Sequence, residues 1–381
     1  MPPTMVRPRK TSAIALPAGG APLPEPGRRV PLSPFDAYWV TLPPVRRVFL
    51  YRSPPSLPPF TDVVAALRSS LERVLPAFHP FAGALTSSPD SQELSIVLPD
   101  GEGACSVALI EAETDLEFDR LVEEEYDEEA LRQLAPDIRR DELPATVMAA
   151  QVSPKQDAAR ERELCLSRRT FTFAASAVQR LKQRLAGAVN TCMPPSTFAA
   201  MAAHGWVSIA RARGFTDDAL VFAVFLADCR AHMSPPVPGA YVGNCLALCT
   251  ASLSGWQLAG PDGPSTALLA IQEAVAEVKR DPLGDRVRWC TKFAAIPPGR
   301  AVILAGSPWF PAYRVDFGFG RPARVELASM NHDGEMVLVA GRERGSVQAS
   351  VAIAADKMTV FRGMFELECD RASAMPESES E

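Results

Sequence analysis

The run PATVMAAQVS at residues 144–153 passes directly into PKQDAARERE, a charged run that begins at Pro154. The first run has the apolar composition of a buried strand. The second is polar, and neither a turn signal nor a second apolar run separates the two. Because a strand needs a hydrogen-bonding partner and a connection to it, the junction between Ser153 and Pro154 restricts how this region can fold.

The rest of the chain predicts a mixture of helices and strands in α+β (α/β) layers. Helices are expected at 61–78 with Thr61 or Asp62 as cap, 116–134, 194–213 with Ser196 or Thr197 as cap, 264–280 and 355–367. A short strand leads into a helix at 168–185, and a central strand is expected at 219–230. Two strands around a turn are expected within 93–112, a third at 144–153, and an antiparallel meander at 324–330, 335–342 and 346–354.

Composition limits the class of protein. The 381 residues are 47% hydrophobic and 22% charged, a globular balance with room for two domains. The net charge of -6, without a basic stripe, argues against a nucleic-acid partner, and no apolar run has the length of a membrane span. The 8 cysteines form no CxxC pair, so we expect reduced thiols in a cytoplasmic protein without a metal site.

The first thirty residues are rich in proline, which predicts a flexible, extended N-terminus at 1–30. They carry five Lys/Arg and one acid, Glu25, so a transit peptide remains an alternative. The prolines disfavour the amphipathic helix that such peptides use, and we therefore favour a plain flexible segment.

General catalytic motifs are absent from the sequence, including GxxxxGK[ST], GxSxG and HExxH. The DFG of VDFGFG lacks the glycine-rich loop and HRD loop of protein kinases. The sequence has four histidines, and each is better explained as a cap, core or turn residue than as a catalyst. They are His79, His204, His232 and His332. Asp316 lies between Val315 and Phe317 and is expected to be a partly buried carboxylate with a structural partner.

Five stretches, taken together and in this order, resemble the plant BAHD acyl-CoA-dependent acyltransferases, in the branch that acylates anthocyanins and phenolic glucosides. They are PLSPFDAYWVTLPPVRRVFLYR, LRSSLERVLPAFHPFAGAL, STFAAMAAHGWV, LADCRAHMSPPVPGAYVGNCL and VDFGFGRP. The resemblance runs from about residue 31 to residue 367. DFGFG is a common form of the family's DFGWG motif, and YVGN departs by one residue from the YFGN of this branch.

The resemblance implies two similar chloramphenicol-acetyltransferase-like domains with mixed sheets and a channel between them. Acyl-CoA is the co-substrate, with no other cofactor, and the acceptor is a small phenolic or flavonoid glycoside. The family's catalytic motif is HxxxD, whose histidine takes the proton of the acceptor hydroxyl as that hydroxyl attacks the thioester. A hydroxyl is a weak nucleophile at neutral pH, and a histidine of pKa ~6.5 suits this task. The resemblance also implies that the protein is a monomer.

In the family, the strand that resembles ATVMAAQVS continues through a hairpin, a second strand, the HxxxD motif and a helix. Here PKQDAARERELCLSRRTFTF resembles the region after that block, so several tens of residues are absent at the junction. The sequence contains no HxxxD, and we therefore assign no catalytic residue. Loss of a positioned general base costs about 10²–10⁴ in rate. The loss would also leave the first domain with an unfilled sheet edge and a thinned core.

The resemblance implies roles for the remaining motif residues. Asp316 of the loop Asp316, Phe317, Gly318, Phe319 and Gly320 is expected to form a partly buried structural pair with Arg230. Residues of YVGN are candidates to line the channel, namely Tyr241, Gly243 and Asn244. The expected domains are 31–153, truncated after Ser153, and 169–367, joined by a linker at 154–168 and followed by an acidic tail at 368–381.

Three interpretations of the activity stay open at this point. The first is an acyltransferase by ancestry that transfers a malonyl or hydroxycinnamoyl group, with this version inactive or weak. The second is a non-catalytic protein that binds acyl-CoA or a phenolic ligand. The third, ranked last, is an active enzyme with a replacement base such as His332 or His204.

Overall fold

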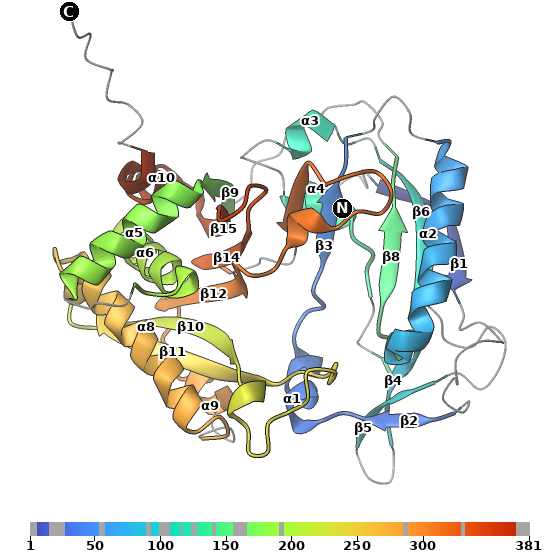
Figure 1. Cartoon of the computed structure of the whole chain (residues 1–381), viewed down its shortest axis with the longest axis horizontal. Coiled ribbons are helices and arrows are strands. Elements are labelled where there is room, and N and C mark those ends of the chain that lie inside the picture. The colour runs from blue at the N-terminus through green and yellow to red at the C-terminus, as the bar shows by residue number, and fades with distance from the viewer. Residues whose placement is uncertain are drawn as a thin grey trace, which may run out of the picture. The chain divides into compact units, whose positions relative to one another are not determined.

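The computed structural model describes two compact units, Met1–Arg162 with Asp316–Ser329 and Glu163–Val315 with Met330–Glu381. Figure 1 labels their helices and strands. Within these units the described residues are 6–14, 27–52, 58–88, 93–98, 107–114, 116, 118–122, 128–138, 142–154, 166–189, 194–284, 289–328 and 332–370.

The strands of the first unit form three sheets among the described residues. One has the order β1-β6-β8, in which β1 pairs antiparallel and β8 pairs parallel with β6. Its strands are β1 (Val6–Ile14), β6 (Val107–Thr114) and β8 (Ala149–Val152). The second sheet is antiparallel, in the order β2 (Arg29–Pro31), β5 (Leu94–Val97), β4 (Ala84–Ser87) and β7 (Ala145–Thr146). The third pairs β3 (Arg47–Leu50) with β13 (Arg324–Leu327), also antiparallel.

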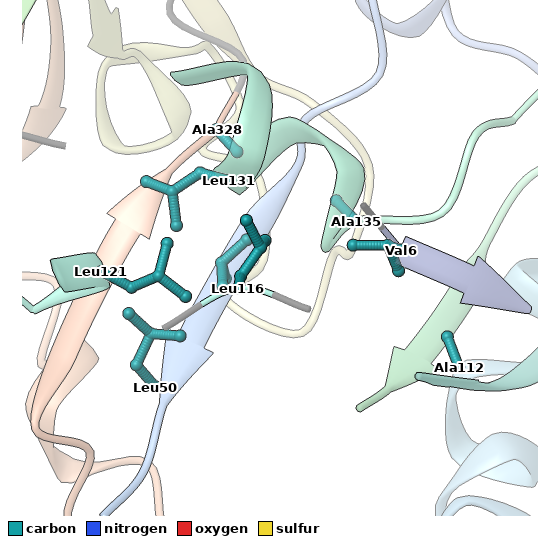
Figure 2. Packing of buried hydrophobic residues seen from close by; sticks show 9 residues of the cluster. Val6, Leu50, Ala112, Leu116, Leu121, Leu131, Ala135 and Ala328 are labelled. Atoms are coloured by element: carbon teal, nitrogen blue, oxygen red, sulfur yellow. The ribbon is translucent and has the colours of Figure 1, made fainter. Parts of the chain in front are cut away.

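Helices of the first unit cover these sheets with apolar side chains. Val64 of α2 and Leu75, at the start of η2, pack with Ile14, Val107 and Leu109 in one core cluster. Figure 2 shows side chains of a second cluster, which draws residues from β1, β3, β6 and the short helices. The helical segments are α1 (Pro34–Ala37), η1 (Tyr38–Thr41), α2 (Phe60–Val74), η2 (Leu75–Ala82), α3 (Phe118–Leu121) and α4 (Glu128–Gln133).

The second unit is built on a six-stranded mixed sheet in the order β11-β10-β12-β14-β15-β9. The β10–β12 and β12–β14 pairs are parallel and the other pairs are antiparallel. In chain order the strands are β9 (Leu166–Phe173), β10 (Leu220–Asp228), β11 (Leu246–Ser254), β12 (Ala301–Ser307), β14 (Glu335–Ala340) and β15 (Val347–Ala354).

Helix α6 (Thr197–Ala212) is almost completely buried, because α8 and α10 pack against it. The Ser196 side chain caps it by accepting from the Ala199 N–H at 3.1 Å. The other helical segments of this unit are α5 (Ala175–Ala188), η3 (Arg230–His232), α7 (Gly255–Ala259), α8 (Gly263–Arg280), α9 (Trp289–Ala294), η5 (Ala312–Arg314) and α10 (Ala355–Asp370). Of the helices in the described ranges, none has the length and apolar character needed to cross a bilayer.

The mixed α+β class is confirmed, and most predicted elements of the second unit are present. The strand-to-helix segment is β9 followed by α5, the central strand is β10, and the helix at 264–280 is α8. The predicted cap Ser196 is confirmed as well. These elements have long, strongly patterned apolar runs, which local sequence predicts well.

Several predictions for the first unit are wrong in pairing rather than in position. Strands β5 and β6 exist but belong to different sheets, so they do not form a hairpin. The single strand expected at 144–153 is two strands, because β7 pairs with β4 while β8 pairs with β6. The expected helix at 116–134 contains two short helices, α3 and α4, and residues 123–127 lie outside the described residues.

The N-terminal segment also differs from its prediction as flexible. Residues Val6–Ile14 form β1, and Val6 and Ile14 are buried. Pro8 is tolerated because β1 is an edge strand with a register irregularity between Pro8 and Lys10. The proline content of this segment was therefore a poor guide to its structure, because the segment contains a strand.

Four further boundaries are corrected. The expected caps Thr61 and Asp62 lie inside α2, whose N-cap is Pro59 without a side-chain cap. Strand β13 pairs with β3, which leaves β14 and β15 as a two-stranded hairpin instead of a three-stranded meander. Strand β9 begins at Leu166, within the expected linker, and α10 extends to Asp370, into the expected tail.

Candidate functional site

The resemblance predicts that the block containing the histidine motif would begin after the carboxyl end of β8. β8 stands at one edge of its sheet among the described strands, and all four of its residues are half-buried. Met148, Ala150 and Val152 pack against the core cluster around Leu109. Gln151 Nε2 donates to the carbonyls of Gln133 at 3.2 Å and Leu134 at 3.0 Å, which ties this edge to the end of α4.

Ser153, the residue that follows β8, carries a hydroxyl without a hydrogen-bond partner among the described residues. The Ser153 hydroxyl is buried and has no hydrogen-bond partner within the part of the chain that the structure describes. A buried hydroxyl without a partner costs free energy, so native structures usually supply one. The description stops at Pro154 and resumes at Leu166 in β9, so the charged run of the junction lies outside the described residues.

Three of the four histidines occupy the structural positions that the sequence predicts, whereas His79 lies inside η2 instead of at a helix end. His204 is buried in α6, where Nε2 lies 3.0 Å from the Phe365 carbonyl oxygen and the ring stacks on Phe365 at 4.9 Å. His79 is half-buried in η2, and His232 and His332 are exposed in short turns. His204 is thus held by packing, which disfavours it as a replacement base.

The loop of residues 316–320 in the first unit is organised by the Asp316 carboxylate. Asp316 Oδ1 accepts from the N–H of Gly318 at 2.8 Å and of Gly320 at 3.0 Å. Both glycines have positive φ, 96° and 80°, which bends the backbone so that both N–H groups reach one oxygen. The carboxylate therefore organises the turn through backbone amides, which the sequence analysis did not predict.

Aromatic rings hold this loop against β3 and the residue that follows it. Phe317 meets Phe49 and Tyr51 edge to face, with centroids 5.9 and 6.0 Å apart, and Phe319 meets Tyr51 at 5.7 Å. Burial, with a smaller contribution from the charge of Asp316, raises the pKa of Tyr51 to about 12. The phenol therefore remains a neutral packing residue at physiological pH.

The expected burial of Asp316 is wrong, because the residue is exposed. The buried carboxylate of this segment is Glu326 in β13, whose Oε1 lies 2.6 Å from Arg324 Nε. Their side chains are 0% and 6% exposed. Residues two apart on a strand share a face, so the alternation in RVEL could have predicted this pair.

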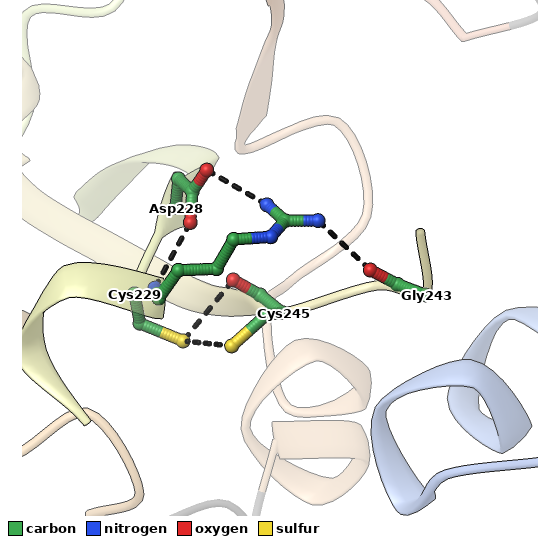
Figure 3. Close-up of polar contacts among 5 residues, drawn as sticks. Asp228, Cys229, Gly243 and Cys245 are labelled. Atoms are coloured by element: carbon green, nitrogen blue, oxygen red, sulfur yellow. Dashed lines mark hydrogen bonds and ion pairs between the residues drawn. The ribbon is translucent and has the colours of Figure 1, made fainter. Parts of the chain in front are cut away.

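Arg230 lies in the second unit, in the turn that follows β10. Its Nη1 pairs with Asp228 Oδ2 at 2.7 Å, and its Nη2 donates to the Gly243 carbonyl at 2.8 Å (Figure 3). Its backbone N–H also donates to Asp228 Oδ1 at 2.9 Å. Asp316 belongs to the first unit, so the predicted Asp316–Arg230 pair joins two units and stays a prediction.

The candidate channel residues lie next to Arg230 in the same unit. The Gly243 carbonyl is its hydrogen-bond acceptor, and Asn244 is half-buried. Tyr241 is exposed, and its ring lies over Gly243 so closely that a Cβ there would be 2.3 Å from the phenol oxygen. The structure thus gathers these residues around one loop, whereas a role in a channel remains a prediction.

Two buried cysteines, Cys229 and Cys245, lie at the two ends of this loop. Cys229 and Cys245 face each other across the ends of β10 and β11, with sulfurs 3.4 Å apart. Burial, and then the hydrogen bond with Cys245, raises the pKa of Cys229 to about 12. Their spacing in sequence gives no hint of this contact, which depends on the β10–β11 register.

Comparison with known proteins places the chain in a family. The model of the Transferase family matches residues 20–154 and 143–368. The chain is 32% identical to the BAHD acyltransferase DCR of Arabidopsis thaliana over 204 residues, 51% of this chain and 42% of that protein. It is 24% identical to phenolic glucoside malonyltransferase 1 of Bemisia tabaci over 433 aligned positions, 88% of this chain and 91% of the relative.

The solved structure of vinorine synthase is similar in fold, with a TM-score of 0.72 at 15% identity over 96% of this chain and 98% of that one. The chain belongs to the Transferase family, and the resemblance to BAHD acyltransferases is confirmed. Its match spans about two fifths of the length of the first Arabidopsis relative.

The longer alignment shows by how much this chain is shorter than the aligned part of the Bemisia relative. Because 88% of 381 residues is 335, about 98 of the 433 aligned positions of the Bemisia relative have no counterpart in this chain. The two family matches meet within residues 143–154, the segment that contains β8 and the junction.

Proposed function

We propose that this chain derives from an acyl-CoA-dependent O-acyltransferase and is itself inactive or weak. The parent reaction transfers a malonyl or hydroxycinnamoyl group from CoA to a hydroxyl of a phenolic or flavonoid glycoside. Membership of the family supports the reaction class. The name of the Bemisia relative, a phenolic glucoside malonyltransferase, supports the donor and acceptor.

One observation carries the proposed loss of activity: the family match is split into two parts that overlap at residues 143–154, around β8 and the junction, and the sequence contains no HxxxD. An acceptor hydroxyl attacks the thioester efficiently only if a base takes its proton as the bond forms. The described histidines are engaged in the core or lie in surface turns. Loss of the base lowers the rate by about 10²–10⁴, equivalent to about 3–5 kcal/mol in the barrier.

The test is a matched pair of chains. One is the present chain, and the other carries a block with the HxxxD motif that the resemblance predicts, inserted between Ser153 and Pro154. Malonyl-CoA and a phenolic glucoside are supplied to both, and free CoA release is measured. We expect the insertion to raise turnover by about 10²–10⁴. Equal turnover by both chains would contradict the proposal, and a His332→Ala variant would then test a replacement base.

A second candidate function is binding of acyl-CoA or a phenolic ligand without turnover. The 316–320 loop and the six-stranded sheet of the second unit are present in this chain, which is consistent with retained binding. Calorimetric titration of the present chain with malonyl-CoA tests this candidate. Binding without CoA release supports it, and the absence of binding excludes it.

We further propose that the protein is a cytoplasmic monomer that needs no cofactor other than its acyl-CoA co-substrate. The family prior and the sequence composition support these assignments. Sedimentation of the purified chain at several concentrations tests the monomer, and a mass that rises with concentration would contradict it.

A further inference from the structure

The geometry of the contact between Cys229 and Cys245 is compatible with a disulfide bond between the two residues. Cys229 follows β10 directly and Cys245 precedes β11, so the two residues extend the antiparallel register Asp228↔Leu246. The Cys229 N–H donates to the Cys245 carbonyl at 3.0 Å. The Cys229 thiol also donates to that carbonyl, at 3.1 Å, and the sulfurs lie 3.4 Å apart (Figure 3).

The backbone spacing of such a pair suits a disulfide. Directly opposed, hydrogen-bonded residues of antiparallel strands have Cα atoms about 5.5 Å apart, which lies within the usual range for a disulfide. Formation of the bond requires the sulfurs to approach to about 2.05 Å, which rotation of the two side chains can provide. Both residues are buried, and a third thiol, Cys249 of β11, is buried opposite Phe225 instead.

We propose that Cys229 and Cys245 are a redox-modification site that oxidised glutathione converts to an intrachain disulfide. The thiolate of one cysteine attacks glutathione disulfide, forms a mixed disulfide and releases one glutathione thiolate. The second cysteine attacks the protein sulfur of that mixed disulfide and releases the second glutathione. Two cysteines are oxidised, one glutathione disulfide is reduced, and the two thiol protons end on the two released glutathiones.

The bond would close a loop of about 15 residues, a length at which cross-links restrict the unfolded chain substantially. This loop contains the Arg230–Gly243 hydrogen bond and the exposed Tyr241. The disulfide would therefore fix the end of the β10–β11 pair, from which the Arg230 and Gly243 contacts emerge. This inference does not depend on the proposed acyl transfer.

The surroundings predict a slow reaction with a durable product. Burial excludes the oxidant until the strand ends open, and the raised pKa of Cys229 keeps its thiolate fraction small at neutral pH. The same burial protects the finished disulfide from reducing thiols. The site would thus respond to sustained oxidation instead of brief exposure.

The test uses the native full chain, incubated in oxidised or reduced glutathione, quenched in acid, alkylated after denaturation, digested and analysed by mass spectrometry. We expect a linked peptide that joins Cys229 to Cys245 and the loss of two of the 8 alkylatable thiols. Cys229→Ser and Cys245→Ser should each abolish the linked peptide, and Cys249→Ser, the matched buried control, should retain it.

The wild-type result decides the proposal even if a serine variant fails to fold. Full alkylation of Cys229 and Cys245 after prolonged oxidation would overturn it. A linkage through Cys249, or glutathione adducts without a linked peptide, would do so as well. In the linked protein the Cys229 amide should exchange with deuterium more slowly than in the reduced protein, and an unchanged rate would contradict the proposed fixing of the strand end.

Discussion

Strands β8 and β15 differ in how completely their surroundings cover them. All but one of the residues of β15 are buried, it has paired neighbours on both sides, and Phe361 and Phe365 of α10 pack against the adjoining β9. Every residue of β8 is half-buried, and among the described strands it pairs with β6 alone. The less completely covered strand is the one that ends at the junction, where the proposed missing block would follow.

The first unit also contains a tightly packed ion pair, that of Arg324 and Glu326. Breaking this pair should give the largest loss of stability. Replacement of Glu326 by Gln should lower the free energy of unfolding by about 3–5 kcal/mol, because it leaves a buried guanidinium without its carboxylate. Asp228→Asn in the second unit is the control, since it breaks a largely exposed pair and should cost less than about 1 kcal/mol. Denaturant titration measures both. Similar costs would remove the distinction between the two pairs.

A matched truncation compares the two strands themselves. Val351→Ala in β15 removes methyl groups from a 0% exposed side chain and should cost about 2 kcal/mol. Val152→Ala in β8 removes the same atoms from a half-buried side chain and should cost less than about 1 kcal/mol. Denaturation midpoints of the two variants are the measurement. Equal losses would show that β8 is as well covered as β15.

Replacing a glycine by alanine should lower stability at one position of the first unit and raise it at one position of the second. Gly318→Ala places a Cβ where φ is 96° with nothing within 4 Å, so only backbone strain, about 1 kcal/mol, should destabilise it. Gly187→Ala in α5 also meets nothing within 4 Å and should stabilise the helix by up to about 1 kcal/mol. Thermal unfolding of both variants compares them, and a shift of the same sign would refute the assigned conformations.

The smallest effect is a pH dependence in the first unit. The pKa of Tyr51 is raised to about 12 in the folded chain, above the value near 10 of an unfolded tyrosine. The unfolded chain therefore loses this proton first, so the contribution of Tyr51 to stability is complete below pH ~10 and falls as the pH rises toward 12. Absorbance titration of the native chain against Tyr51→Phe should assign the late-ionising phenol to Tyr51. Its ionisation near pH ~10 in the folded chain would contradict the burial.

Local pattern predicted those elements whose apolar runs are long. The strand-to-helix run at β9 and α5, the buried α6 and the central β10 could all be read from residue order. Pairing could not, because β5 and β6 are adjacent in sequence yet join different sheets. Partners of short strands depend on contacts that a single sequence does not encode locally.

The candidate site shows the same division. The glycines of DFGFG correctly indicated a tight loop, since glycine has intrinsic turn chemistry, whereas the backbone partners of Asp316 were not predicted. The burial of that aspartate was misjudged, because burial depends on what packs against the loop from distant parts of the chain. Glu326 is buried instead, on the strand that pairs with β3.

Hydrogen exchange at β8 tests the central claim most directly. Strand β9 is the matched control, because it is also an edge strand of its sheet but has a mostly buried pattern. We predict that amides of Ala149–Val152 exchange faster than those of Leu166–Phe173, and that insertion of the block with the HxxxD motif between Ser153 and Pro154 slows β8 while β9 stays unchanged. Equal protection of β8 and β9 in the present chain would contradict the account.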